Sequence, residues 1–127
     1  MIELDHLNLP VADLARSRAF YEELLDPFGF PVNRDFADVA VGFGAGPNAI
    51  LALVRTGSSV QPIHIAFRLD SRPEVDRFYS LAVSLGAGDN GSPGPRPQYH
   101  EHYYAGFVRD PDGHNLEAVC HLPLAVA

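Results

Sequence analysis

Apolar side chains recur every three or four positions in two stretches of the chain, and this spacing predicts two amphipathic helices. The first helix is expected to begin after Asp13, which can act as an N-cap, and to end near Pro27 and Gly29. The second is expected to begin after Ser71 and to end at Gly86. The residues of the two buried stripes are Leu14, Ser17, Tyr21, Leu24 and Phe28, and Val75, Phe78, Tyr79, Ala82 and Leu85.

Alternation of apolar and polar side chains predicts strands in most of the remaining chain. The sequence Asp110-Pro111-Asp112-Gly113 lies in the last strand region, where its proline and glycine favour a tight hairpin turn. The stretch 86–98 is rich in glycine and proline, so we expect a mobile loop or lid there. The predicted strands cover residues 2–9, 31–36, 38–43, 48–55 and 62–69, followed by two strands between 99 and 121.

The two halves of the chain are related by an internal repeat. Each half has the predicted order strand, helix, strand, strand, strand, and a half of this length buries too little apolar surface to be stable alone. We therefore expect one domain over residues 1–127, built from two modules, 1–57 and 60–121, that are joined near 58–61. The residue pairs with one constant separation are His6 with His64, Phe20 with Phe78, and Tyr21 with Tyr79.

Composition narrows the classes of function. The formal net charge of −7 argues against a nucleic acid or an anionic membrane as partner, because both need clustered positive charge. All nine cationic side chains are arginine, which excludes Schiff-base chemistry on lysine. The start of the chain lacks the features of a signal peptide, and the single cysteine, Cys120, fits a reducing compartment, so we expect a cytoplasmic protein.

One carboxylate, Glu117, falls in an otherwise apolar predicted strand, where an ionised group is costly unless another group pairs with it. Strand alternation places Glu117, His6 and His64 on the faces opposite the strongly apolar side chains. The repeat relates the two histidines, so these three side chains are expected to meet in one cavity. The counterpart of Glu117 in the first half is Ala52, so the predicted site has three protein ligands.

A second cluster of polar and aromatic residues spans 99–104. If this segment is a strand, His100, His102 and Tyr104 share one face and Tyr99, Glu101 and Tyr103 share the other. One interpretation is a polar edge strand; the other places His100, His102 and Tyr104 near the predicted site as catalytic acids, bases or donors. His114 is expected to be a surface or hairpin residue, while the role of His121 stays open.

In three segments the chain resembles the vicinal oxygen chelate superfamily, which includes glyoxalases, bleomycin-resistance proteins and extradiol dioxygenases. These segments are His6-Leu7-Asn8-Leu9 with Phe20-Tyr21, then His64-Ile65-Ala66-Phe67, and Asp110 to Glu117. The resemblance implies an α+β fold in which two βαβββ modules form curved mixed sheets around a central cavity, and frequent homodimers. It also implies that His6, His64 and Glu117 bind a divalent metal, with Asn8, Ala52, Asn115 and Tyr103 as candidate substrate-binding residues.

The sequence lacks residues that particular activities in this group would be expected to need. A glyoxalase I-type isomerase would be expected to have a glutamate where this chain has Ala52. Fosfomycin-resistance transferases use lysine and other groups to hold a phosphonate, whereas this chain has no lysine and has Asn8 where a threonine would be expected. Extradiol dioxygenases share the ligand set but are usually longer.

Two functional hypotheses follow. The first is a metal-dependent lyase, isomerase or dioxygenase acting on a small molecule with two neighbouring oxygens, which would chelate the ion at open positions. Two histidines and one carboxylate suit Fe²⁺, Zn²⁺, Mn²⁺, Ni²⁺ or Co²⁺, and the sequence does not select among them. The second is a metal-free protein that sequesters a small molecule or an antibiotic, as bleomycin-resistance proteins do.

Overall fold

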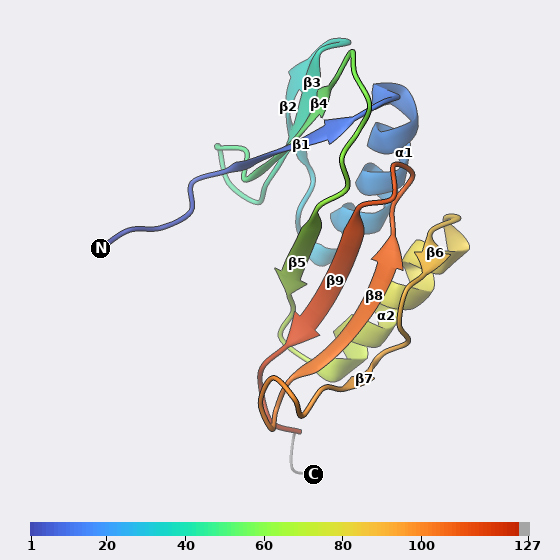
Figure 1. The fold of residues 1–127 in the computed structure, drawn as a ribbon. Helices are drawn as coiled ribbons and strands as arrows, with labels where there is room; N and C mark the ends of the chain where they lie inside the picture. The colour runs from blue at the N-terminus through green and yellow to red at the C-terminus, as the bar shows by residue number, and fades with distance from the viewer. Residues whose placement is uncertain (125–127) are drawn as a thin grey trace. The chain divides into compact units, whose positions relative to one another are not determined.

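The computed structural model describes residues 1–124 of the 127-residue chain and divides it into two units, Met1–Gln61 and Pro62–Ala127. Each unit contains one β-sheet and one α-helix, so the predicted α+β class is confirmed (Figure 1). No helix in residues 1–124 is both long enough and apolar enough to cross a membrane.

The first unit is a four-stranded mixed sheet with a helix. The sheet has the order β1-β4-β3-β2, in which β1 is parallel to β4 and the other neighbours are antiparallel. The most completely buried apolar residues of this unit come from β1, α1, β3 and β4. The elements are β1 Leu7–Val11, α1 Leu14–Leu25, the 3-10 helix η1 Asp26–Phe28, β2 Val32–Phe36, β3 Ala40–Phe43 and β4 Leu51–Arg55.

Helix α1 begins and ends where its sequence predicts. The Asp13 side chain accepts a hydrogen bond from the Arg16 backbone N–H at 3.1 Å, and this N-cap satisfies a donor that the first turn leaves free. After η1, Gly29 adopts a φ of 77°, which an L side chain disfavours, and the chain turns away. The stripe residues Leu14, Ser17, Tyr21 and Leu24 are buried, as expected.

The second unit is a five-stranded sheet with helix α2 packed on β8 and β9. Strand β9 lies at its centre, parallel to β5 and antiparallel to β8. Ser71 caps α2 by accepting from the Glu74 N–H at 3.3 Å, and Phe67 of the sheet contacts Phe78 of the helix at a ring separation of 5.9 Å. The elements are β5 His64–Arg68, α2 Arg72–Ser84, β6 Gly88–Asp89, β7 Gly94–Pro95, β8 Tyr104–Arg109 and β9 Asn115–Cys120.

The predicted hairpin between β8 and β9 is confirmed. The Asp110 side chain accepts hydrogen bonds from the backbone N–H groups of Asp112 at 2.9 Å and His114 at 2.8 Å, while Gly113 has a φ of 88°. His114 itself differs from the expectation of a surface or hairpin residue, because its side chain is fully buried. Its Nδ1 accepts from the Ile63 N–H at 3.0 Å, so the ring joins the turn to the chain that enters β5.

Two other expectations are wrong. Residues 2–6 are outside any strand, and β1 begins at Leu7. Residues 99–103 form turns, because the Tyr99 N–H bonds to the Arg96 carbonyl at 3.0 Å and the Tyr103 N–H to the His100 carbonyl at 3.2 Å. The division of residues 99–104 into two faces therefore does not hold, since alternation requires an extended chain.

The glycine- and proline-rich stretch 86–98, where a mobile loop or lid is expected, is paired in part with the sheet. It contributes β6 and β7, which both pair with β8. Arg96 fastens it further, because its guanidinium donates to the carbonyls of Ser92, Gly94 and Pro95 and lies 5.4 Å from the centre of the Phe107 ring. These contacts hold the stretch along the edge of the second sheet.

Candidate metal centre

Glu117 lies on the central strand of the second sheet. In the register of the sheet it is opposite Ala66 of β5 and Phe107 of β8. Its side chain is only 3% exposed and lies on the face opposite α2, because Phe67 and Phe78 meet on the helix side. An ionised carboxylate at this depth requires partners for both of its oxygens.

His64 supplies the first partner. Its Nε2 lies 2.8 Å from Oε1 of Glu117, and its ring contacts that of Phe107 at 6.2 Å. The histidine side chain is 53% exposed, whereas the carboxylate is buried. The histidine of this pair is therefore accessible to solvent, and a ligand site needs such access.

Tyr103 supplies the second partner, because its hydroxyl donates a hydrogen bond to Oε2 of Glu117. Burial and, after it, the hydrogen bond to Glu117 raise the pKa of Tyr103 to about 12. The phenol is therefore protonated at neutral pH and holds the carboxylate as a donor. The sequence had indicated Tyr103 only as a substrate-binding candidate.

The third predicted ligand, His6, lies in the first unit, just before β1. Its Nδ1 is 2.7 Å from Oδ2 of Asp5, and both side chains are largely exposed. Two predicted substrate-binding residues of this unit are direct neighbours, since Asn8 pairs with Ala52 in the β1–β4 register. Within the described residues, neither unit by itself contains three His, Cys, Asp or Glu side chains grouped to hold a metal ion.

His100 belongs to an aromatic cluster around Tyr103. Its Nδ1 accepts from the His102 backbone N–H at 3.1 Å, and its Nε2 lies 2.9 Å from Nδ1 of His121. The rings of Tyr99, His100 and His121 surround Tyr103 at centroid separations of 4.8, 5.4 and 5.2 Å. The cluster thus supports the phenol that holds Glu117. Sequence reasoning left His121 open because its partner is remote in the chain.

The other two predicted catalytic side chains have different surroundings. Nε2 of His102 is 3.2 Å from Oε1 of the exposed Glu101. Tyr104 donates to Oδ1 of Asp76 on α2 at 2.6 Å, and burial followed by this hydrogen bond raises its pKa to about 12. The guanidinium of Arg72 lies 5.0 Å from the Tyr104 ring. Tyr104 therefore interacts with the helix, and Tyr103 with the carboxylate.

Asn115 shares the sheet face of Glu117, two positions away on β9, and it pairs with His64 and Arg109 in the register. Its side-chain oxygen accepts from the Asn90 amide at 3.0 Å. The amide group is therefore held in a fixed orientation next to the His64–Glu117 pair.

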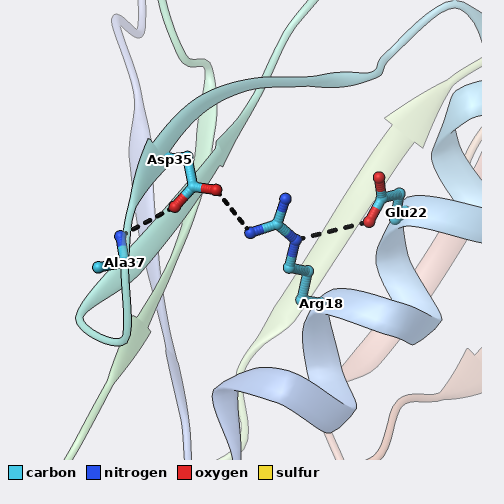
Figure 2. Close-up of polar contacts among 4 residues, drawn as sticks. All are labelled: Arg18, Glu22, Asp35 and Ala37. Atoms are coloured by element: carbon cyan, nitrogen blue, oxygen red, sulfur yellow. Dashed lines mark hydrogen bonds and ion pairs between the residues drawn. The ribbon is translucent and has the colours of Figure 1, made fainter.

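A groove of about 600 Å³ in the first unit contains none of the predicted ligands. One wall carries Arg18, which bridges Oδ2 of Asp35 at 3.0 Å and Oε2 of Glu22 at 3.5 Å (Figure 2). The Arg18 hydrogen bond, aided by that from the Ala37 N–H, lowers the pKa of Asp35. Because these charges are paired with one another, we interpret the contacts as structural.

The contacts at Glu117 bring two of the three predicted ligands together. Imidazole nitrogen with carboxylate oxygen is a donor set that suits Zn²⁺, Fe²⁺, Mn²⁺, Ni²⁺ and Co²⁺. The chemistry of this pair therefore fits a divalent ion, and Tyr103 and Asn115 lie beside the pair as hydrogen-bonding groups.

Comparisons with known proteins agree with this fold. The sequence model of the Glyoxalase/Bleomycin resistance protein/Dioxygenase superfamily matches residues 3–118 of this chain. No curated protein matches the chain.

Solved structures with the same fold differ widely from this chain in sequence. A glyoxalase/bleomycin resistance protein from Albidiferax ferrireducens is 22% identical, with a TM-score of 0.80 over 91% of this chain and 97% of that chain. A lactoylglutathione lyase from Agrobacterium tumefaciens is also 22% identical, with a TM-score of 0.73 over 94% of each chain. TioX from Micromonospora is 18% identical, with a TM-score of 0.73 over 95% of this chain and 100% of that chain. At such identities these likenesses show the fold alone.

Proposed function

Because the chain belongs to the Glyoxalase/Bleomycin resistance protein/Dioxygenase superfamily, we propose that it is a divalent-metal-dependent enzyme acting on a small substrate with two neighbouring oxygens. The reaction class is that of a lyase, an isomerase or a dioxygenase. The observation that carries the proposal is the 2.8 Å contact between Nε2 of His64 and Oε1 of Glu117, which joins an accessible imidazole to a buried carboxylate.

In this proposal His64 and Glu117 hold the ion together with His6, the repeat equivalent of His64. When bound, the ion polarises the two substrate oxygens and stabilises negative charge that develops on them. The metal is Fe²⁺, Zn²⁺, Mn²⁺, Ni²⁺ or Co²⁺, and the functional unit is a homodimer. The catalytic roles of His100, His102 and Tyr104 stay predictions.

The chain's own residues prepare the carboxylate. Tyr103 donates to Oε2 of Glu117, and this bond fixes the orientation in which Oε1 meets His64. The raised pKa of Tyr103 keeps its proton in place at neutral pH, so the phenol acts as a hydrogen-bond donor. The half-buried ring of Phe107 lies beside the His64 ring and packs against one side of it.

The second candidate function is a metal-free binding protein of the bleomycin-resistance type. One observation favours it: both oxygens of Glu117 already have partners, His64 and Tyr103, without an ion. A carboxylate satisfied in this way can order a binding surface without holding an ion.

Metal analysis separates the two functions. The protein is purified without chelator or affinity-tag metal, and bound metals are measured by mass spectrometry together with the thermal shift on adding each of the five ions. We expect stoichiometric binding and a rise in Tm for the wild type, because an ion that binds the folded state stabilises it.

His64→Ala and Glu117→Gln should lose both the metal and the rise in Tm. His102→Ala is the matched control, because the 41% exposed ring of that histidine pairs with Glu101 within residues 1–124, and the bond to the His100 ring comes from the backbone N–H of His102, which the substitution keeps. Absence of bound metal and of any thermal shift in the wild type would contradict the enzyme and leave the binding protein.

A further inference from the structure

The face of the second sheet that carries Glu117 is rich in positive charge, although the chain as a whole has a net charge of −7. Sheet alternation and pairing place Arg68 of β5 and Arg109 of β8 on this face. Arg96 adds a third guanidinium over Phe107, which pairs with Glu117. Among the described residues of β5, β8 and β9, Glu117 is the only carboxylate.

Of these three arginines, Arg68 is the one whose guanidinium makes no hydrogen bond to the rest of the described protein. Arg96 donates to three backbone carbonyls, and Nη1 of Arg109 lies 3.4 Å from the Gly113 carbonyl. Arg68 is exposed, and its guanidinium has no hydrogen bond or ion pair within residues 1–124. A guanidinium presents five donors in a planar fork that matches a carboxylate or a phosphate group.

The position of Arg68 brings it within reach of a molecule at His64 and Glu117. Ala66 separates Arg68 from His64 along β5 and lies opposite Glu117, so a methyl group is the only side chain between them on that strand. Alternate residues of a strand are roughly 6.6 Å apart, and neighbouring strands roughly 4.8 Å. An arginine side chain spans such distances, so one ligand a few atoms long can contact the pair and the guanidinium together.

We propose that Arg68 binds an oxyanion group of the substrate, a carboxylate or a phosphate, while the neighbouring oxygens of the same molecule lie at His64 and Glu117. This inference rests on the proposed function and adds to it the class of substrate: a small anionic metabolite. The bond is charge-assisted and bidentate, and it gives the substrate one orientation on the sheet.

The test compares glycerate, which has two neighbouring hydroxyls and a carboxylate, with its neutral isostere glyceramide, and includes inorganic phosphate as a separate probe. Dissociation constants are measured by calorimetry for the wild type, Arg68→Gln and Arg68→Lys, each with and without bound Mn²⁺. Arg77→Gln is the matched control, because Arg77 is a 65% exposed residue of α2 whose partner is Glu74 at 3.9 Å.

We expect Arg68→Gln to weaken binding of glycerate or phosphate by roughly tenfold or more, with an intermediate loss in Arg68→Lys and none in Arg77→Gln. Glyceramide binding and the Mn²⁺ affinity should not change. Preference for phosphate over glycerate would identify a phosphate group and support the inference. Equal affinities of wild type and Arg68→Gln, or no binding of either anion, would overturn it.

The metal-free measurements distinguish this failure from failure of the proposed function. If the wild type binds no Mn²⁺ and still shows anion binding that depends on Arg68, the enzyme proposal fails and the oxyanion subsite stands in a binding protein. If Mn²⁺ binds and Arg68 has no effect on either anion, the metal centre stands and the subsite fails.

Discussion

At equivalent positions of their sheets, the two units carry the polar side chain on different strands. In the first unit the register pairs Asn8 of β1 with Ala52 of β4, and in the second it pairs Ala66 of β5 with Glu117 of β9. The long polar side chain is thus on the outer strand in one unit and on the inner strand in the other. Only the inner position is buried deeply enough for a carboxylate to need fixed partners.

The polar contacts of the units differ for the same reason. In the first unit the contacts of Arg18 with Asp35 and Glu22 lie at the surface, where water competes for each group. In the second unit Glu117 is buried and bonded to His64 and Tyr103. The comparison teaches that the repeat supplies two similar sheets, and that burial of one carboxylate gives the second sheet a fixed polar cluster at the position where the first sheet has Ala52.

The largest expected effect is a difference in the free energy of unfolding between variants of the two repeat-related histidines, His64 and His6. His64→Ala removes the partner of a buried carboxylate oxygen, so we expect the free energy of unfolding to fall by about 1–3 kcal/mol. His6→Ala should leave it nearly unchanged, because His6 is about half exposed and its one polar side-chain contact within residues 1–124 is with its neighbour Asp5. Urea unfolding of both metal-free variants measures the difference.

Both variants, His64→Ala and His6→Ala, should bind the metal ion more weakly than the wild type. Loss of metal from both, with loss of stability only in His64→Ala, would sharpen the comparison. Equal destabilisation by the two substitutions would break it.

A smaller effect is expected from Tyr103. The folded-state pKa is about 12 against an ordinary 10, so the phenol contributes stability below pH 10 that is lost as the pH rises through about 12. Wild-type protein should therefore lose stability over this range, and Tyr103→Phe should lose less. Ultraviolet titration of tyrosinate checks the assignment.

Tyr104→Phe is the matched control for the tyrosine experiment, because Tyr104 also has a pKa of about 12 and contacts Asp76 in place of Glu117. In each single variant, the titration should show one fewer tyrosine that ionises at unusually high pH. Only Tyr103→Phe should also change metal affinity, so an equal change in Tyr104→Phe would count against the role of Tyr103 at Glu117.

The smallest effect is expected at the surface pair of the first unit. The lowered pKa of Asp35 means that its contribution to stability is present above the ordinary value of 3.8 and is lost as the pH falls through the lower folded-state value. Asp35→Asn should cost less stability at neutral pH than Tyr103→Phe, and the cost should shrink further in high salt. Thermal unfolding at two salt concentrations tests this, and an effect as large as that at Tyr103 would contradict it.

Much of the fold is predictable because its signals are local. Asp13 and Ser71 cap the helices from within a few residues, and the Asp110–Gly113 turn carries its own proline and glycine. The segment 99–103 misleads because alternating residue types suggest a strand, whereas short-range hydrogen bonds fold it into turns. His114 misleads likewise, because its partner Ile63 is remote in the sequence.

The sequence by itself determined the two helices, the β8–β9 hairpin, the α+β class, and the expectation that Glu117 requires a partner. Capping, turn chemistry and the cost of a buried charge are properties of the residues and their near neighbours. The sequence also placed His64 with Glu117, but only the tertiary structure decided that the two are in direct contact, that Tyr103 binds the other carboxylate oxygen and that Tyr104 faces α2. These contacts join segments distant in the chain, and strand register and burial select among side chains that local patterns cannot distinguish.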